Sequence, residues 1–450
     1  MVRATRLWLS ILACGLSAAA SAGIGPELAR RLGAELTPLG ATRTGNAEHS
    51  IPPWEGGLPL QALGAGERYA DPYANDAPRF TIDAAHLKDY QDQLTPGQRA
   101  WLERYPDIRL PVYPTRRSYA APPAYYTGTL RNAQHTYLNE ELPKDAILGV
   151  PFPAPDDGTE AIWNHVLRWR GLGRERAYVM GAVSAAGVLS LVHVRERARF
   201  YPVDAPTTKK DAHPLSDTAV TVLAPDRLAG AVKLVALAWA GPLRAWQKSP
   251  GQALSLSTTD AGGDAPVLGA EGAINEDQSE GFSGPPARYA WKLLGRHERF
   301  VPYNAYRLHA GRQPYAELLG AHQLKPEATR YELHRLWTVE GRCKPTEHCA
   351  YPRRTLYLDE DSWQVLLADL YDRQDRLAML QEVHTLLAYD QPALLPVAET
   401  YHDLLGGRYA VSGLSNAEAE ARYLDLPPEA LERSPVLRWA RKGGPPYQPD

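Results

Sequence analysis

Apolar and polar side chains alternate along residues 331–339, and this alternation is the clearest structural signal in the chain. The odd-numbered positions carry Tyr, Leu, Trp and Val, with one charged residue at Arg335. A period of two with one mostly apolar face is typical of a β-strand that buries one side. We therefore expect a strand whose odd-numbered side chains face the core. His334 lies on the other, polar face and is expected at the surface.

Two further apolar patterns follow this strand after short turns. Residues 354–358 begin a second strand, and residues 363–367 place Trp363, Val365 and Leu367 on one face of a third. The turns between them contain acidic residues, glycine or proline, which favour chain reversal. The sequence therefore predicts an antiparallel meander whose apolar face covers other parts of the chain.

Strand-like runs recur along the chain, whereas helical patterns are few. Runs rich in β-branched and aromatic residues occupy residues 188–194, 232–246, 288–294, 300–308 and 377–389. A helix is expected within residues 83–105, because Thr95-Pro96-Gly97-Gln98 has the residues of a capping box with proline in the first turn. A second helix is expected from Thr159. The predicted fold class is mainly β (α+β).

The chain divides by composition into segments of different character. We expect a signal peptide at residues 1–22, an extended Gly/Pro-rich arm at 23–80, one β-rich domain at 81–425 and a polar, Pro-rich tail at 426–450. Residues 249–286 form a long Gly/Ser/Asp/Pro-rich loop inside that domain. Loops of this length are uncommon unless they are functional or mobile, so this loop is a candidate lid.

The first residues have the pattern of a secretory signal. Arg3 and Arg6 precede a short apolar run, and Ala20-Ser21-Ala22 offers small residues for cleavage. No later apolar run reaches transmembrane length, so we expect a soluble periplasmic protein after cleavage. An alternative is a lipoprotein anchored through Cys14, which follows Ile11-Leu12-Ala13.

Cleavage after residue 22 would leave two cysteines, Cys343 and Cys349. In an oxidising compartment, two cysteines this close are expected to form a disulfide that closes a small loop. His348 lies between them, but a zinc site needs three or four ligands and the sequence offers no second cysteine pair. The sequence therefore favours the disulfide and predicts no metal site.

Charge and motifs exclude several function classes. The formal net charge of -3 provides no broad attraction to nucleic acid or to an anionic membrane. The chain has no Walker loop, dinucleotide-binding fingerprint, zinc-protease helix or nucleophile elbow. We therefore predict no cofactor, and an enzyme is not favoured.

Two groups of charged residues have alternative interpretations. Asp359-Glu360-Asp361 could bind calcium or supply a catalytic acid and base, but adjacent residues point in different directions, so a solvated turn is favoured. Arg335 lies on the apolar face of its strand, where an unpaired guanidinium is unfavourable. It therefore needs either a buried carboxylate or the head group of an amphipathic ligand.

Aromatic residues with a polar tip are abundant, with 11 Trp and 24 Tyr against only 5 Phe. Such side chains suit surfaces that are partly in contact with water, although β-sheets also use them as core. Together with Arg335, the predicted ligand-binding set contains Trp291, Trp337, Trp363 and Tyr389.

Several short motifs along the chain match one family in the expected order. They occupy residues 36–41, 45–47, 112–117, 149–153, 160–165, 301–306, 330–335 and 357–363. On these motifs the chain resembles the secreted proteobacterial proteins called domain of unknown function 1329. The resemblance implies a fold similar to the periplasmic lipoprotein-sorting carriers, which is a strongly curved antiparallel sheet forming an unclosed barrel around helices or a lipid-sized cavity.

The resemblance also implies a place beside an outer-membrane β-barrel protein and an inner-membrane exporter of hydrophobic molecules. Three functions are compatible with the sequence. The first is a periplasmic carrier of a lipid or other hydrophobic molecule. The second is a structural adaptor that docks an outer-membrane protein without a small ligand. The third is a hydrolase acting on glycan or lipid, with His334 and the acidic residues 359–361 in acid/base roles.

Overall fold

The computed structural model describes residues 26–64, 67–203, 213–252, 256–258, 263–311 and 313–441. The predicted signal peptide at 1–22 and Cys14 lie outside these residues. Among the residues described, no helix combines the length and apolar character needed to cross a membrane.

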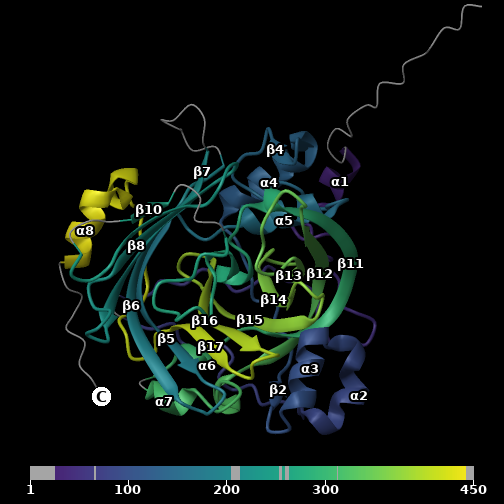
Figure 1. The fold of residues 1–450 in the computed structure, drawn as a ribbon. Coiled ribbons are helices and arrows are strands. Elements are labelled where there is room, and N and C mark those ends of the chain that lie inside the picture. The colour runs from purple at the N-terminus through teal and green to yellow at the C-terminus, as the bar shows by residue number, and fades with distance from the viewer. Residues whose placement is uncertain are drawn as a thin grey trace, which may run out of the picture.

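One large curved sheet of 16 strands dominates the molecule (Figure 1). Its order is β1-β2-β12-β13-β14-β15-β16-β17-β5-β6-β7-β8-β9-β10, with β11 paired to β12 and β18 paired to β5. The pairs are antiparallel except for a parallel contact between β2 and β12. The order does not close on itself, which confirms the predicted curved, unclosed barrel.

The strands of this sheet have the following bounds: β1 Phe80–Ile82, β2 Leu110–Val112, β5 Gly173–Val183, β6 Leu189–Phe200, β7 Pro214–Ala224, β8 Val232–Ala238, β9 Arg244–Lys248, β10 Leu256–Thr258, β11 Tyr289–Pro302, β12 Tyr331–Cys343, β13 Arg353–Asp359, β14 Val365–Tyr371, β15 Leu377–Ala388, β16 Ala393–Asp403, β17 Tyr409–Leu414 and β18 Arg422–Tyr423. A separate hairpin joins β3 (Tyr137–Asn139) to β4 (Leu142–Lys144).

The described helices are short: α1 Pro26–Arg31, α2 Leu87–Tyr90, α3 Pro96–Arg104, α4 Pro123–His135, α5 Gly158–Val166, α6 Tyr306–His309, α7 Tyr315–Leu318 and α8 Arg433–Arg441. The capping box at the start of α3 is confirmed, since Thr95 and Gln98 bond each other's backbone N–H groups. Five of these helices were not predicted: α1, α4, α6, α7 and α8. Helix α4 follows a proline-rich stretch, and α8 lies within the predicted tail.

Helix α5 occupies the gap between the two arms of the open sheet, at the top of Figure 1. Ala161 and Ile162 pack in the main core and the helix contacts β11 and β12. Trp163 and Val166 pack instead with Leu215 of β7 and other residues of that side. One helix therefore joins two arms of the sheet that no backbone ladder connects.

The space enclosed by the curved sheet, which we call the hollow, is largely filled by residues 263–288. This segment includes the 3-10 stretch η3 (Glu276–Gly281), which contacts β14, β15 and β16. Ala270, Ile274 and Phe282 are buried in the same core as the strands. From residue 263 onward the predicted lid therefore lies within the hollow and forms part of the core, whereas residues 256–258 form β10 at one end of the sheet order.

The other face of the sheet is also covered. Trp101 and Leu102 of α3 form a second core with Leu380 of β15 and residues of β1 and β2. The N-terminal arm adds further contacts, because the Trp54 indole donates a hydrogen bond to the carbonyl of Tyr119. Much of the sheet is thus buried on both faces.

This double burial corrects the expectation for β12. The even-numbered face is the more buried one: His334 is only 1% exposed, whereas Arg335 and Trp337 are half-buried. Tyr303 stacks on His334 with ring centroids 4.0 Å apart. The alternation of apolar residues did not reveal this, because the buried even-numbered face carries polar groups that are satisfied internally.

Three other predicted features differ in detail. Trp363 precedes β14 and lies in a turn with a φ of 62°, so the third strand begins at Val365. Residues 289–294 belong to one long strand that continues to Pro302, and Arg288 ends the 3-10 turn before it. The predicted strand at 300–308 therefore ends at Pro302, and α6 follows.

The disulfide between Cys343 and Cys349 is present, with the two Cα atoms 6.2 Å apart.

Replacing Thr95 by Ala should destabilise the protein by about 1–3 kcal/mol. The change removes the N-cap of α3 and one of the hydrogen bonds received by the buried carboxylate of Asp369. Urea unfolding would measure the loss. Thr127→Ala is the matched control, since that exposed hydroxyl bonds only a carbonyl of its own helix and should change stability by less than about 0.5 kcal/mol. Equal effects of both changes would contradict the prediction.

Candidate ligand-binding site

Strand β5 places a row of arginines on the inner side of the sheet. Arg174, Arg176 and Tyr178 occupy alternate positions and so share one face. Glu196 lies opposite Arg176 on β6. Its carboxylate accepts two hydrogen bonds of 3.0 Å from Arg176 and two, of 3.1 and 3.3 Å, from Arg174.

Glu280 brings a second carboxylate to these arginines from η3. Its backbone has a φ of +54°, which turns the segment sharply inside the hollow. The carboxylate accepts a hydrogen bond from Arg168, which follows α5, and one of 3.1 Å from Arg174. Arg170 lies 3.6 Å away. One carboxylate is thus shared by three guanidinium groups.

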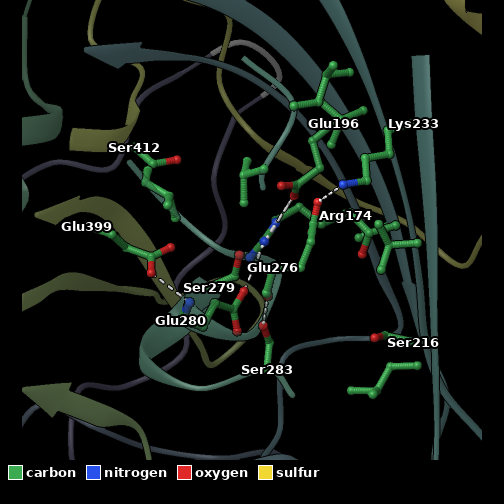
Figure 2. A pocket seen from close by; sticks show the side chains of 18 of the residues that line it. Arg174, Glu196, Ser216, Lys233, Glu276, Ser279, Glu280, Ser283, Glu399 and Ser412 are labelled. Atoms are coloured by element: carbon green, nitrogen blue, oxygen red, sulfur yellow. Dashed lines mark hydrogen bonds and ion pairs between the residues drawn. The ribbon is translucent and has the colours of Figure 1, made fainter. Parts of the chain in front are cut away.

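Two further carboxylates complete the cluster (Figure 2). Glu399 of β16 accepts a 2.6 Å hydrogen bond from the backbone N–H of Glu280 and a 3.0 Å bond from the Tyr401 hydroxyl. Lys233 of β8 forms a 2.5 Å ion pair with Glu276. Segment 263–288 is therefore fixed to both sides of the hollow by charged groups.

The surroundings shift the pKa values of Glu280 and Glu399 in opposite directions. Burial alone would raise the pKa of Glu280, but Arg168, Arg170, Arg174 and Arg176 together hold it well below its ordinary range. Burial raises the pKa of Glu399 to about 7, and the nearby charge of Glu280 adds to this shift. Burial also lowers the pKa of the Arg168 guanidinium to about 9.

A cavity of about 110 Å³ lies against this cluster, and we call it the arginine cavity. Its walls come from β5–β8, β16 and the segment in the hollow. The charged groups that line it are Arg170, Arg174, Arg176, Glu196, Lys233, Glu276, Glu280 and Glu399. Figure 2 shows several of these side chains converging on the segment that carries Glu276 and Glu280.

A second cavity of about 310 Å³ lies nearby between β5, β6 and the strands β15–β17, and we call it the apolar cavity. Most of its lining is apolar or aromatic: Ala182, Val183, Val188, Ala270, Ala273, Tyr351, Ala378, Met379, Tyr401, Tyr409 and Ala410. Its charged lining residues are Glu271, Asp403 and Arg408. Such a lining suits the hydrocarbon part of a ligand.

Tyr401 lines both cavities, so they adjoin at this side chain. The segment in the hollow also contributes to both, with residues 270–273 in the apolar cavity and Val267, Leu268 and Ile274 in the arginine cavity. A shift of this segment would join the two spaces. The joined space would have an apolar end and a charged end.

The predicted ligand-binding residues lie elsewhere in the core. Trp337 and Trp363 stack with their centroids 5.9 Å apart, and Trp291 packs against Phe282. Tyr389 packs edge-on against Tyr69. None of these residues lines the arginine cavity or the apolar cavity, so their contact with a ligand remains a prediction.

Arg335 has the buried carboxylate that its position required. Its guanidinium donates a 2.7 Å hydrogen bond to Glu360 and further bonds to the carbonyls of Thr42 and Thr44 in the N-terminal arm. The alternative role of Arg335, recognition of a ligand head group, was suggested because an unpaired guanidinium on an apolar face is unfavourable. Since the guanidinium is paired, this reason no longer applies.

The acidic run at 359–361 is buried, so its interpretation as a solvated turn was wrong. Arg117 explains the burial of Asp361, because its guanidinium bonds both carboxylate oxygens at 2.6 and 2.8 Å. His334, Asp359 and Asp361 each offer a ligand atom within 4.8 Å of the others. Arg117 already bonds both oxygens of Asp361, and we assign no metal ion there.

The cavities were not predicted from the sequence. The available signal was the alternation of Arg174, Arg176 and Tyr178 along one strand. This alternation places two arginines on the same face of the strand, just as the alternation along β12 places Arg335 on one face. Arg176 pairs with Glu196 on the adjacent strand, but Glu280, which Arg174 also bonds, is more than a hundred residues away and lies in a loop. No local pattern indicates that such a loop enters the core.

Replacing Glu399 by Gln should change how stability depends on pH. The folded state raises this pKa from its ordinary value of 4.5 to about 7, so the folded protein binds the proton more tightly than the unfolded chain. The wild-type contribution therefore falls as pH rises from 4.5 to 7, whereas Gln cannot ionise. The variant should gain up to about 3 kcal/mol relative to wild type over this range. Urea unfolding at pH 5 and pH 8 would measure it, and a difference independent of pH would contradict the assignment.

Comparison with known proteins identifies relatives across most of the chain. The family model described as "Protein of unknown function (DUF1329)" matches residues 81–433. An uncharacterized protein of Pseudomonas aeruginosa is 38% identical over 429 residues, which cover 92% of each chain.

Solved structures of similar proteins have lower identity. A DUF1329 family protein from Desulfovibrio piger aligns with a TM-score of 0.42 and 14% identity, over 59% of this chain and 92% of that chain. A putative outer membrane lipoprotein-sorting protein domain from Vibrio parahaemolyticus gives a TM-score of 0.44 and 13% identity, over 62% and 98%. The family model and the 38% identical relative each span most of the sequence, and the chain belongs to the DUF1329 family.

Proposed function

We propose that this protein is a periplasmic carrier that shields a lipid or another hydrophobic molecule inside its curved sheet. The observation that carries the proposal is the apolar cavity of about 310 Å³ within the hollow. Sites for small molecules begin near 300 Å³ and are lined mainly by apolar and aromatic side chains. Transfer of hydrocarbon from water into such a site is favourable by roughly 25 cal/mol per Å² before the costs of ordering.

Binding of a larger lipid would require movement of the segment in the hollow. Residues 270–273 form one wall of the apolar cavity, and the glycine at 272 has a φ of +78° with open space around it. A turn of this kind at the mouth can move without displacing a large side chain. The predicted lid is thus retained in the proposal as an internal wall formed by residues 263–275.

The disulfide supports the proposed compartment. Disulfides persist in the periplasm and other oxidising environments and are rare in the cytosol. This agrees with the signal peptide expected from the sequence. An outer-membrane β-barrel and an inner-membrane exporter remain the partners that the family resemblance suggests for loading and release.

A structural adaptor is the second candidate, and one observation favours it. Chain segments rather than empty space occupy most of the hollow, since residues 263–288 and α5 pack in the main core. A protein that only docks a partner needs no interior space. The buried acidic run lends no support to a hydrolase, because Glu360 and Asp361 are bonded by arginines and lie in the wall of neither cavity.

Replacing Ala378 by Phe should weaken binding of an apolar ligand by about tenfold or more, because the added ring occupies the apolar cavity. Titration with the fluorescent apolar dye N-phenyl-1-naphthylamine would measure it, with Tm as a check on folding. Ala290→Phe is the matched control, since Ala290 is exposed on β11 and should leave dye affinity unchanged. Equal dye affinity in wild type and Ala378→Phe would refute binding in this cavity, and failure of the wild-type protein to bind any apolar probe would favour the adaptor.

A further inference from the structure

Four arginines beside the proposed ligand space share two carboxylates. Arg168, Arg170, Arg174 and Arg176 converge on the carboxylates of Glu196 and Glu280. Every one of these ion pairs involves one of the two acids. The four arginines therefore exceed them by two positive charges, in a place where water can screen little of the excess.

The other charged groups around the cavity do not remove this excess. Lys233 and Glu276 neutralise each other as a 2.5 Å pair. Glu399 already accepts hydrogen bonds from the Glu280 backbone and from Tyr401. With Glu399 fully ionised the charged groups that line the cavity would balance, and Arg168, which does not line it, would carry the one positive charge in excess. The raised pKa of Glu399 means that it is partly protonated near neutral pH, which leaves the lining more positive.

Arg170 is the least satisfied of the four. Its Nε is buried without a hydrogen-bond partner, and its nearest carboxylate oxygen is 3.6 Å away on Glu280, which Arg168 and Arg174 already bond. Its guanidinium lies over the ring of Phe200, 4.2 Å from the centroid, and it lines the arginine cavity. A guanidinium whose one ion pair is long and shared, beside an open space, favours an anion in that space.

The dimensions limit what the anion can be. One water molecule takes about 30 Å³ in the liquid, so about 110 Å³ accommodates a compact group of a few heavy atoms. Tyr401 separates this space from the larger apolar cavity. A ligand that reached both would have a small anionic head and a hydrocarbon tail.

We propose that the ligand is an anionic amphiphile whose phosphate or carboxylate head binds Arg170, Arg174 and Arg176 while its tail lies in the apolar cavity. This inference rests on the proposed carrier function and specifies its ligand class. Guanidinium groups bind both kinds of head through paired hydrogen bonds, so the two share one recognition chemistry. Tyr401 would lie where the head joins the tail.

The test compares ten-carbon ligands that share a tail and differ in the head. Decyl phosphate, decanoate and 1-decanol would be titrated against the full mature protein by displacement of N-phenyl-1-naphthylamine. We expect at least one anionic ligand to bind about tenfold or more tightly than decanol, because a charged hydrogen-bonded pair replaces an unsatisfied guanidinium. The stronger of the two anions identifies the head group. Inorganic phosphate alone should not displace the dye.

Arg170→Gln is the diagnostic variant, because it leaves Glu280 bonded to Arg168 and Arg174 and so preserves the main ion pairs. It should reduce the preference for the anion over decanol to less than about threefold while decanol affinity stays unchanged. Arg170→Lys should retain part of the preference, since it keeps the charge. Arg342→Gln is the matched control, since this exposed arginine pairs only with Glu340 of its own strand and should alter nothing.

The outcomes separate this inference from the carrier function. If decanol binds as tightly as both anions, or if Arg170→Gln keeps the full preference while its Tm shows a folded protein, the anionic head is refuted and the carrier remains. If inorganic phosphate displaces the dye as well as decyl phosphate does, the site takes a free anion and the amphiphile is refuted. If no ligand with a tail binds, the carrier function itself is refuted.

Discussion

The interior of this protein depends on the ion pairs and hydrogen bonds that Glu280 makes. The Glu280 carboxylate receives Arg168 from the end of α5 and Arg174 from β5, while the backbone N–H of Glu280 donates to Glu399 of β16 and its carbonyl accepts from Gln364. Three parts of the chain that are distant from Glu280 in sequence therefore meet at this residue. Without the carboxylate the inner segment would lose its ion pairs with Arg168 and Arg174, and two arginines would be buried with fewer partners. Removing one member of a buried ion pair is among the most damaging single changes in proteins.

Buried charge is a general property of this fold rather than a local exception. Arg117 and Arg335 bind the acidic run 359–361, and Arg354 bonds the buried Asp277 at 2.8 Å. An apolar core of equal volume is often at least as stable as one with paired charges, so the pairs are better explained by specificity of arrangement. In this protein they fix loops and the N-terminal arm against a sheet whose pattern alone would accept other packings.

The sequence was informative where a structural feature depends on neighbouring residues. The period of two along β12, the capping box at Thr95 and the short cysteine spacing each involve residues within one element or loop, and all were recognised. The requirement for a carboxylate near Arg335 followed from its position on an apolar face. The curved, unclosed form of the sheet came from the family resemblance, since local periodicity cannot specify how strands are ordered.

The features that escaped prediction depend on what covers each face. His334 and the acidic run were assigned to the surface because polar residues usually face water. Here Tyr303, Arg117 and the N-terminal arm cover them, and each comes from a distant part of the chain. The cavities escaped for the same reason. Their walls combine strands with a loop whose entry into the core has no local signature, since glycine and polar residues dominate its composition.

The position of α5 gives the molecule an unusual mechanical character. A barrel closed by strand pairing can widen only by breaking backbone hydrogen bonds, whereas here side-chain packing around Ala161, Ile162 and Trp163 joins the arms. Packing contacts are short-ranged and nondirectional, and they can slide and re-form in small steps. The continuous sheet therefore joins the two arms on one side, and the packing of α5 joins them on the other. A change in the girth of the interior would therefore require no backbone hydrogen bond between neighbouring strands to break.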